Sequence, residues 1–253
     1  MKPAIVIPFY NHERAIARTV AALRDYRLPC WIVDDGSDAR CAPVLDEIER
    51  SESSWVRVLR TAPNRGKGCA VMTGLRAALD AGHSHGAQID ADGQHDARDL
   101  ARLLAAAARR PEALVTGVPV YDASVPKSRL YGRYLTHLWV WINTLSFRVR
   151  DSMCGFRVYP LAAAIAAWDG RRSSRMEFDT EILVRLFWAG TEVVSVPVRV
   201  TYPVDGVSHF DLWRDNLRIG AMHARLFFGM LRRLPLLLAR RFAPPTRHIP
   251  ESR

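Results

Sequence analysis

Short apolar runs alternate with amphipathic segments through the first half of this 253-residue chain. The runs, of which Ala4–Ile7 is typical, indicate buried strands. The segments between them repeat their apolar positions every three or four residues, which indicates helices. This alternation predicts an α/β fold with a doubly wound, mostly parallel sheet. The predicted strands cover residues 4–7, 30–33, 56–59 and 114–117, with a central strand ending at residue 90, and the predicted helices cover residues 13–23 and 44–49, a segment from the 64–68 loop to residue 79, and residues 99–108.

The second half of the chain is less regular, and its predicted helices are longer. Pro197 within a β-branched run indicates an edge strand or a bulge. Pro235 predicts an interruption of the last helical stretch. We therefore expect an α/β domain over residues 1–210 and a C-terminal amphipathic helical extension, associated with a membrane, over residues 211–253. The predicted elements are a helix over 127–145, a loop over 151–157, a helix over 177–189, a strand over 193–200 and helical structure over 211–238.

Four short polar segments stand where predicted strands end. In doubly wound sheets, ligands bind in the crevice at the carboxyl ends of the strands. The coincidence of polar residues with these ends predicts an active site at one edge of the sheet. The four segments are Pro8–Asn11, Asp34–Ser37, Asn64–Gly68 and Asp90–Gln94.

Asp90 and Asp92 are one residue apart and are followed by Gly93. Along an extended backbone, side chains at alternate positions point the same way, so these two carboxylates would converge. Two like charges at that separation repel unless a cation lies between them. Carboxylate oxygens suit Mg²⁺ or Mn²⁺, which keep open positions for substrate phosphates. The alternative is a polar turn, since aspartate and glycine are common turn residues.

Charge narrows the choice of partner. The net charge of +10 favours nucleic acid, an acidic membrane surface or a phosphorylated substrate. A nucleic-acid partner is not expected, because no known nucleic-acid motif is present and the basic residues are spread along the chain. A nucleotidyltransferase on a similar sheet is the second enzyme hypothesis. Such enzymes usually carry a glycine-rich basic loop directly after the first strand, and residues 8–13 lack one.

The four cysteines show no Cys-x-x-Cys spacing, which predicts reduced thiols and no metal framework. Residues 1–8 are too short for a signal sequence, and no apolar run is long enough to cross a bilayer. We therefore expect a cytoplasmic protein.

The polar segments, taken in order together with Cys154-Gly155-Phe156-Arg157, resemble those of the family 2 glycosyltransferases with a GT-A fold. The similarity is greatest to the polyprenyl-phosphate sugar synthases of the dolichyl-phosphate mannose synthase type. It covers roughly the first 200 residues. The resemblance implies an inverting, metal-dependent transfer of a sugar from a nucleotide diphosphate sugar to a lipid-linked or membrane-bound acceptor, with polyprenyl phosphate as a candidate.

The resemblance also implies roles for single residues. Asp90 would contact the ribose or the metal ion, Asp92 would bind the ion, and Gln94 would assist. His209 would complete the metal shell, although a lone histidine is more often structural. The residues implied in binding the donor are Pro8 and Tyr10, which would line the nucleobase pocket, Asp35, which would hydrogen-bond the base, and Asn11. His12 stands where the family often has glutamate, so the base stays open between uracil and guanine.

Basic and acidic residues outside the metal motif are candidates for the rest of the site. Lys67 lies in a glycine-flanked loop that opens a helix, a place suited to phosphate. Arg129 and Arg133, with Lys127, fall where the resembling subgroup engages the acceptor phosphate; the alternative is a solvated basic face. Arg157 would also bind substrate, or else form an ion pair with Asp151. The candidates for a general base are Asp151, Asp179 and Glu181, and a phosphate acceptor would need none, because it is already an anion.

The most apolar stretch of the chain is Leu226–Leu238. As a helix it would be about 20 Å long, short of the roughly 30 Å hydrocarbon core. Its pattern predicts a helix lying in the interface of an anionic membrane, which would make the protein peripheral on the cytoplasmic face. The alternative is an amphipathic helix packed on the sheet. The predicted lipid side carries Leu226, Met230, Leu234, Leu237 and Leu238, and the predicted polar side carries Arg225, Arg232, Arg233 and Arg240.

Overall fold

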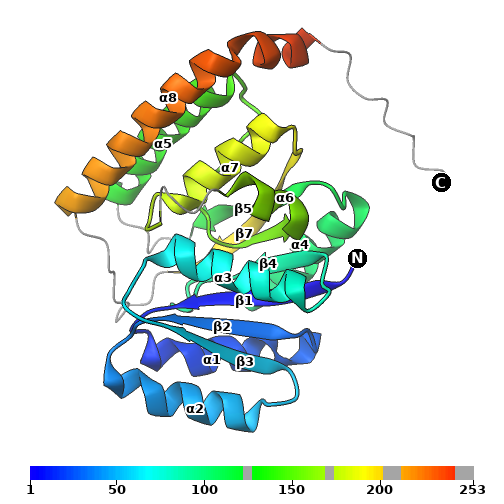
Figure 1. The fold of residues 1–253 in the computed structure, drawn as a ribbon, viewed down its shortest axis with the longest axis vertical. Helices are drawn as coiled ribbons and strands as arrows, with labels where there is room; N and C mark the ends of the chain where they lie inside the picture. The colour runs from blue at the N-terminus through cyan, green and yellow to red at the C-terminus, as the bar shows by residue number, and fades with distance from the viewer. Residues whose placement is uncertain (122–126, 169–173, 202–211, 243–253) are drawn as a thin grey trace.

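Seven strands form one mixed sheet in the computed structural model, which describes residues 1–121, 127–168, 174–201 and 212–242 (Figure 1). The strand order is β3-β2-β1-β4-β6-β5-β7. Strand β6 is antiparallel to both of its neighbours, and the other pairs are parallel. The predicted mostly parallel sheet is therefore confirmed. The strands are β1 (Pro3–Phe9), β2 (Cys30–Asp35), β3 (Val56–Thr61), β4 (His85–Gln88), β5 (Leu114–Tyr121), β6 (Arg157–Pro160) and β7 (Val193–Val200).

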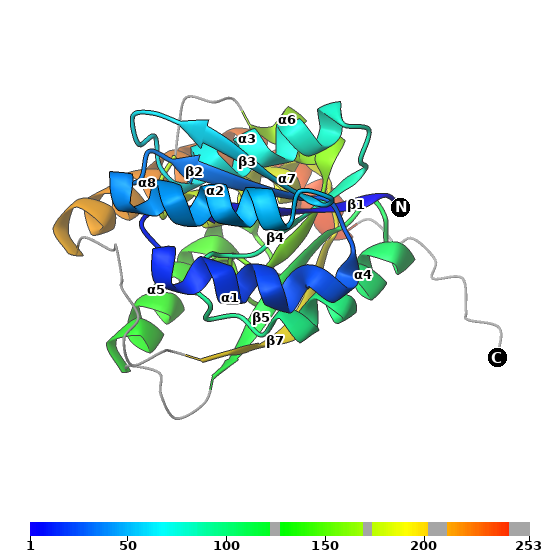
Figure 2. The same ribbon diagram turned by 90° about the horizontal axis from the view of Figure 1, so that it is seen from below.

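Helices cover both faces of this sheet. Figures 1 and 2 show α1, α2 and α4 on one face and α3, α6 and α7 on the other. Helices α5 and α8 lie side by side as an outer layer beyond α7, and both contact it (Figure 1). The α-helices are α1 (Glu13–Leu23), α2 (Ala42–Ser51), α3 (Lys67–Asp80), α4 (Leu100–Arg109), α5 (Lys127–Thr144), α6 (Leu161–Ala167), α7 (Phe178–Ala189) and α8 (Leu212–Phe242).

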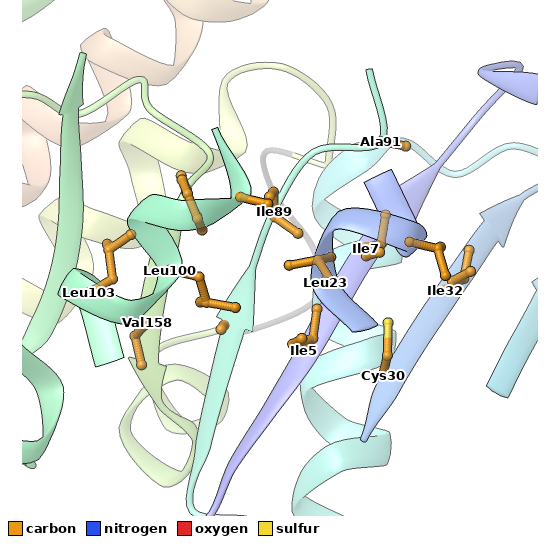
Figure 3. Packing of buried hydrophobic residues seen from close by; sticks show 14 of the residues in the cluster. Ile5, Ile7, Leu23, Cys30, Ile32, Ile89, Ala91, Leu100, Leu103 and Val158 are labelled. Carbon is orange, nitrogen blue, oxygen red and sulfur yellow. The ribbon is translucent and has the colours of Figure 1, made fainter. Parts of the chain in front are cut away.

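Successive side chains along each strand point to opposite faces of the sheet, and this divides the core into two clusters. On β1, Ile5 and Ile7 point toward the face covered by α1, α2 and α4 (Figure 3), and Phe9 belongs to the same cluster. Ala4 and Val6 point the other way and pack with residues of α3, α7 and α8. Each fully buried isoleucine contributes roughly 1.5–3 kcal/mol. The sheet is thus fixed from both sides, which holds the strand ends in place.

The structure differs from the prediction in the middle of the chain. Strand β4 ends at Gln88, so Asp90 and Asp92 lie in the turn after the strand rather than on it. Strand β6 and helix α6 were not predicted, because β6 is only four residues long and has no alternating pattern. Strand β7 is at the edge of the sheet, as Pro197 indicated.

Helix α8 corrects the predicted membrane face. Leu226, Met230 and Leu237 are buried in the second core cluster, and Leu234 packs against it. Arg233 lies over the Trp188 ring at 4.7 Å, and Arg240 donates to the Trp188 carbonyl oxygen at 2.8 Å. Leu238, the fifth residue of the predicted lipid side, is 40% exposed. The expectation of lipid contact is wrong for the other four residues, and for them the amphipathic-helix alternative holds, with helices rather than the sheet as the partner.

Pro235 does not end α8. It removes one backbone donor, and Figure 1 shows the helix changing direction toward its C-terminal end. Among the described residues, no helix combines the length and the apolar composition that a bilayer crossing needs.

Candidate active site

The carboxyl ends of β1, β2 and β4 lie at one edge of the sheet, because these strands are parallel neighbours. Asn11 joins the first two ends: its Oδ1 accepts from the Asp38 N–H at 2.8 Å, and its own N–H donates to Ser37 Oγ at 3.1 Å. Pro8 is buried and Tyr10 is half-buried at the same strand end. The polar segments therefore meet, while the nucleobase roles of Pro8 and Tyr10 and the substrate contact of Asn11 stay predictions.

Asp35 ends β2 and holds the loop that opens α3. Its Oδ1 accepts from the Arg65 N–H at 2.9 Å, and its Oδ2 accepts from the Gly66 N–H at 2.5 Å. The side chain is buried, so these charge-assisted hydrogen bonds fix the backbone just before Lys67. The structure thus gives Asp35 a positioning role, and its contact with a nucleobase stays a prediction.

Lys67 is the first residue of α3, and its ammonium joins two carboxylates. Its Nζ lies 2.8 Å from Asp90 Oδ2 and 2.8 Å from Asp179 Oδ2. Burial alone would lower the pKa of Lys67, but the charges of Asp179 and Asp90 raise it above its ordinary value. Burial would likewise raise the pKa of Asp90, and the charge of Lys67 outweighs it and lowers that pKa. Lys67 and Asp90 therefore each stabilise the charged form of the other.

A buried polar network supports this cluster from below. Gln88 Nε2 donates toward Asp90 Oδ1 at 3.4 Å and Asp179 Oδ1 at 3.3 Å. Tyr159 donates its hydroxyl proton to Gln88 Oε1 at 3.1 Å. Gln88 and Tyr159 are fully buried on the adjacent strands β4 and β6. The orientation of both carboxylates is thus set by side chains that substrate cannot reach.

Arg157 belongs to this support and not to the surface of the site. Its side chain is fully buried, and its guanidinium donates to the carbonyl oxygens of Cys154, Asp179 and Ser152 at 2.7, 2.5 and 2.7 Å. This placement corrects the expected substrate contact, and Asp151, the expected ion-pair partner, pairs with Arg133 instead. Arg157 also balances charge, because it adds a second cation to a cluster with two carboxylates.

Gly155 is required by a close approach. A Cβ atom built on it would lie 2.5 Å from Asp90 Oδ2 and 2.7 Å from Lys67 Nζ. Ordinary van der Waals contact begins near 3.4 Å, so a larger residue would push the ion pair apart. The glycine of the Cys-Gly-Phe-Arg segment therefore has a physical reason that the sequence alone did not give.

Asp151, a candidate base, is held by several donors. Its Oδ1 accepts from the N–H groups of Met153 and Cys154 at 2.9 and 2.7 Å, and its Oδ2 accepts from Arg133 Nε at 2.5 Å. Burial would raise the pKa of Asp151, but hydrogen bonding from His137 and the charge of Arg133 hold it well below its usual range. Asp151 therefore fixes the loop that carries Gly155 and is a poor proton acceptor.

The other two candidate bases are also ion-paired. Asp179 pairs with Lys67, and Glu181 pairs with Arg185 and Arg225 at 2.7 and 3.2 Å. Both carboxylates are buried. Each of the three candidates thus has a cationic partner, which disfavours general-base catalysis by any of them.

Asp92 and Gln94 follow Asp90 at the rim of the cluster, and all three are half-buried. The Gln94 N–H donates to Asp92 Oδ1 at 3.0 Å. Their carboxylate and amide oxygens suit Mg²⁺ or Mn²⁺, so the donor set fits such an ion chemically. Within the described ranges, no three histidine, cysteine, aspartate or glutamate side chains form a ready-made metal cluster. His209 lies outside the described residues.

Of the three residues predicted to bind the acceptor phosphate, the structure describes the side chain of one. Arg133 lies on α5 against Asp151. Lys127 and Arg129 lie on the same helix, outside the part of the chain whose side chains are described. The phosphate-binding role of these residues stays a prediction.

Gln88, Tyr159 and His95 are site residues that sequence reasoning gave no role. The His95 ring lies 5.2 Å from that of Phe156. Burial lowers the pKa of His95, and the charges of Asp90 and Asp92 act in the opposite direction, so His95 lies close to both carboxylates. Its place directly after Gln94 was the one available signal. Gln88 and Tyr159 gave none, because their pairing joins distant parts of the chain.

The fold and this polar cluster define an α/β enzyme with its site at the carboxyl ends of the strands. The sequence model described as glycosyl transferase family 2 matches residues 4–166, and the chain belongs to that family. It is therefore a glycosyltransferase.

Two characterised relatives illustrate the similarity. The undecaprenyl-phosphate mannosyltransferase of Micrococcus luteus is 29% identical over 78% of this chain and 83% of its own. The UDP-N-acetylglucosamine–dolichyl-phosphate N-acetylglucosaminyltransferase of Methanococcus voltae is 25% identical over 78% of this chain and 85% of its own. Both act on lipid phosphates, as their names state.

Solved structures share the fold at low sequence identity. Glucosyl-3-phosphoglycerate synthase of Mycobacterium tuberculosis, in complex with Mn²⁺, UDP and glucosyl-3-phosphoglycerate, superposes with a TM-score of 0.62 at 17% identity, covering 97% of this chain and 81% of that one. A mannosyltransferase of Pyrobaculum calidifontis, in complex with GDP-mannose and Mn²⁺, gives 0.62 at 15% identity, covering 94% and 68%. These similarities confirm the predicted GT-A fold.

Proposed function

We propose that this protein transfers a sugar, with inversion, from a nucleotide diphosphate sugar to the phosphate group of a polyprenyl-type lipid. The observation that carries the proposal is the pairing of Asp151, Asp179 and Glu181 with arginine or lysine. A hydroxyl acceptor needs a base to remove its proton, whereas a phosphate is already an anion at neutral pH. A site in which every candidate base is held in an ion pair suits a phosphate acceptor, which needs no base.

The chemistry then needs no proton transfer from the acceptor. An acceptor phosphate oxygen forms the new bond to the anomeric carbon, while the bond from that carbon to the donor's β-phosphate oxygen breaks. The nucleoside diphosphate leaves with the bonding electron pair, and attack opposite the leaving group inverts the anomeric configuration. Lys67 lies beside Asp90, where its ammonium can bind a phosphate of the donor.

Asp90, Asp92 and Gln94 would hold the divalent ion. When bound, Mg²⁺ or Mn²⁺ would supply electrostatic stabilisation of the leaving diphosphate. Asp90 already has a cationic partner, because Lys67 binds its Oδ2, and Gln88 donates toward its Oδ1. The negative charge of Asp90 is therefore balanced even without the ion. Asp92 would be the carboxylate that depends most on the ion.

The relatives support a lipid acceptor. The mannosyltransferase of Micrococcus luteus is named for undecaprenyl phosphate, and the N-acetylglucosaminyltransferase of Methanococcus voltae for dolichyl phosphate. An acceptor of this kind resides in a bilayer, so we place the protein at the cytoplasmic face of a membrane with anionic lipids. The division into residues 1–210 and a C-terminal membrane-associating segment belongs to the same proposal.

The test compares a polyprenyl phosphate with the matching polyprenol as acceptors, using UDP-glucose, UDP-N-acetylglucosamine and GDP-mannose as donors. We expect product with the phosphate and at least about 10²-fold less with the alcohol, because the alcohol lacks a base. The one-bond coupling between C1 and H1 of the product, measured by NMR, should show an anomeric configuration opposite to that of the donor. Equal transfer to the alcohol, or retention, would refute the proposal.

A further inference from the structure

Helix α8 carries a second apolar stripe, separate from its buried side. The stripe recurs every three or four residues and is exposed along its whole length. Its largest members are well exposed: Trp213 by 83%, Leu217 by 71% and Phe228 by 62%. Amphipathic helices of soluble domains usually expose a polar face, so this arrangement calls for a partner. The stripe consists of Trp213, Leu217, Gly220, Ala224, Phe228, Leu231, Pro235 and Leu238.

Helix α5 extends this stripe into a broader surface. Tyr134, Leu135 and Leu138 are exposed by 70%, 60% and 50%. Trp139 marks the seam between the helices, because its ring lies 6.4 Å from that of Phe227 on α8. Leu138 directly precedes Trp139, Phe228 directly follows Phe227, and the two helices are in contact. The two stripes are therefore neighbours, and together they form what we name the α5–α8 surface.

A row of arginines borders the stripe on α8. These residues also recur at helical spacing and are exposed. Arg218 and Arg225 keep 42% and 38% of their side chains exposed although each contacts a buried carboxylate. Apolar side chains flanked by arginines at one edge match the depth profile of a bilayer, with hydrocarbon below and anionic headgroups above. The row consists of Arg214, Arg218, Arg225 and Arg232.

We propose that the α5–α8 surface rests on an anionic lipid bilayer, with Leu217, Phe228 and Leu138 among the acyl chains and the arginine row at the headgroups. The inference builds on the proposed function, because it names the surface that brings the site to a membrane-bound acceptor. A second copy of this chain fits less well. Two copies would each present a strongly basic surface, because the chain carries a net charge of +10, and like charge opposes their association.

The surface also lies close to the site. Arg133, next to Tyr134, holds Asp151 and thereby the loop with Gly155. Figures 1 and 2 show the N-terminal end of α8 on the same side of the molecule as the carboxyl ends of β1 and β2. A lipid held at this surface would have its phosphate near the polar cluster.

The test is co-sedimentation of the full chain with vesicles of phosphatidylcholine alone or mixed with phosphatidylglycerol. We expect binding to the anionic vesicles, and at least tenfold weaker binding of the double variant Leu217→Glu/Phe228→Glu. The matched control is Ala105→Glu/Ala108→Glu, which adds the same charge at exposed positions of α4, on the opposite face of the sheet. This control should bind like the wild type.

Thermal unfolding by circular dichroism should show all variants folded, and binding of the donor nucleotide should be unchanged. Vesicle binding by the Leu217→Glu/Phe228→Glu variant equal to wild type would overturn the inference. So would a lipid-free dimer that this variant dissociates, because the surface would then join two copies. A protein that binds vesicles through this surface but transfers no sugar would refute the proposed function alone.

Discussion

At the scale of single residues, the site depends on balanced charge in a confined space. Lys67 and Arg157 offset Asp90 and Asp179, and buried uncharged donors fix the geometry. Removing one member of a buried ion pair typically costs about 3–5 kcal/mol, because its partner keeps an uncompensated charge. The stability of the protein is therefore sensitive to any change in the spacing of this cluster. Asp92 lies at the rim, outside the cluster, so its replacement should not carry that cost.

The metal hypothesis makes a prediction about Asp92. Asp92→Ala should abolish sugar transfer without unfolding the protein. The activation free energy should rise by several kcal/mol, because the leaving diphosphate would lose its counterion. Mn²⁺ binding, measured by titration calorimetry, should weaken in parallel. Asp80→Ala, at an exposed position of α3, is the control and should match the wild type. Full activity in EDTA would rule the metal role out.

Gly155 allows a sharper test of the ion pair. Gly155→Ala places a methyl group 2.5 Å from Asp90 Oδ2, so the Lys67–Asp90 contact must lengthen or the loop must move. We expect donor affinity or turnover to fall at least about tenfold, equivalent to about 1.4 kcal/mol. Gly132→Ala on α5 meets nothing within 4 Å and should keep full activity. Wild-type kinetics for Gly155→Ala would show that the Lys67–Asp90 spacing does not matter.

At the scale of elements, the contact between α5 and α8 contains a titratable group. His223 of α8 is buried, its Nδ1 lies 3.4 Å from Asn143 Nδ2, and its ring stacks on Trp139 at 5.9 Å. Burial lowers the pKa of His223 to about 4. Among the described residues, Nε2 has no hydrogen-bond partner. The neutral ring is therefore the form that suits this interface.

The sign of the pH effect follows from that lowered pKa. The unfolded chain, with a histidine pKa of about 6.5, binds the proton more readily, so stability is complete above about pH 6.5 and falls toward pH 4. The loss should reach roughly 3 kcal/mol. His223→Leu should flatten this part of the curve of Tm against pH, measured by circular dichroism. Ala224→Leu, which keeps the histidine, should retain the slope; an equal slope in His223→Leu would contradict the assignment.

Element patterns explain what the sequence could and could not predict. Helix α1 and strand β7 have the predicted bounds, because their periodicity is strong and local. The pairing of β4 with β6, which brings Gln88 near Arg157 and Tyr159, is antiparallel and long-range, so no local signal announced it. Helix α8 has two apolar stripes, and periodicity alone does not tell which one is packed against the protein.

At the scale of the whole molecule, the net charge of +10 and the α5–α8 surface favour the same partner. Deleting Leu226–Arg253 would be a poor test of membrane binding, because Leu226, Met230 and Leu237 are part of the core. Added salt tests membrane binding without removing core residues, because it screens the attraction between exposed charges and the membrane. Electrostatic attraction between exposed charges and a surface extends about 10 Å at 0.1 M salt and about 3 Å at 1 M.

We therefore predict that salt separates two kinds of acceptor. Transfer to a polyprenyl phosphate in anionic vesicles should fall severalfold between 0.1 and 1 M NaCl, because the arginine row loses its attraction to the headgroups. Transfer to a short-chain, soluble phosphate should change little, since the buried Lys67 cluster is screened much less. Charge reversal by Arg232→Glu should reduce the vesicle rate at low salt and leave the soluble rate unchanged, with Ala105→Glu as the matched control. Equal salt sensitivity for both acceptors would place the effect in the active site rather than at the membrane.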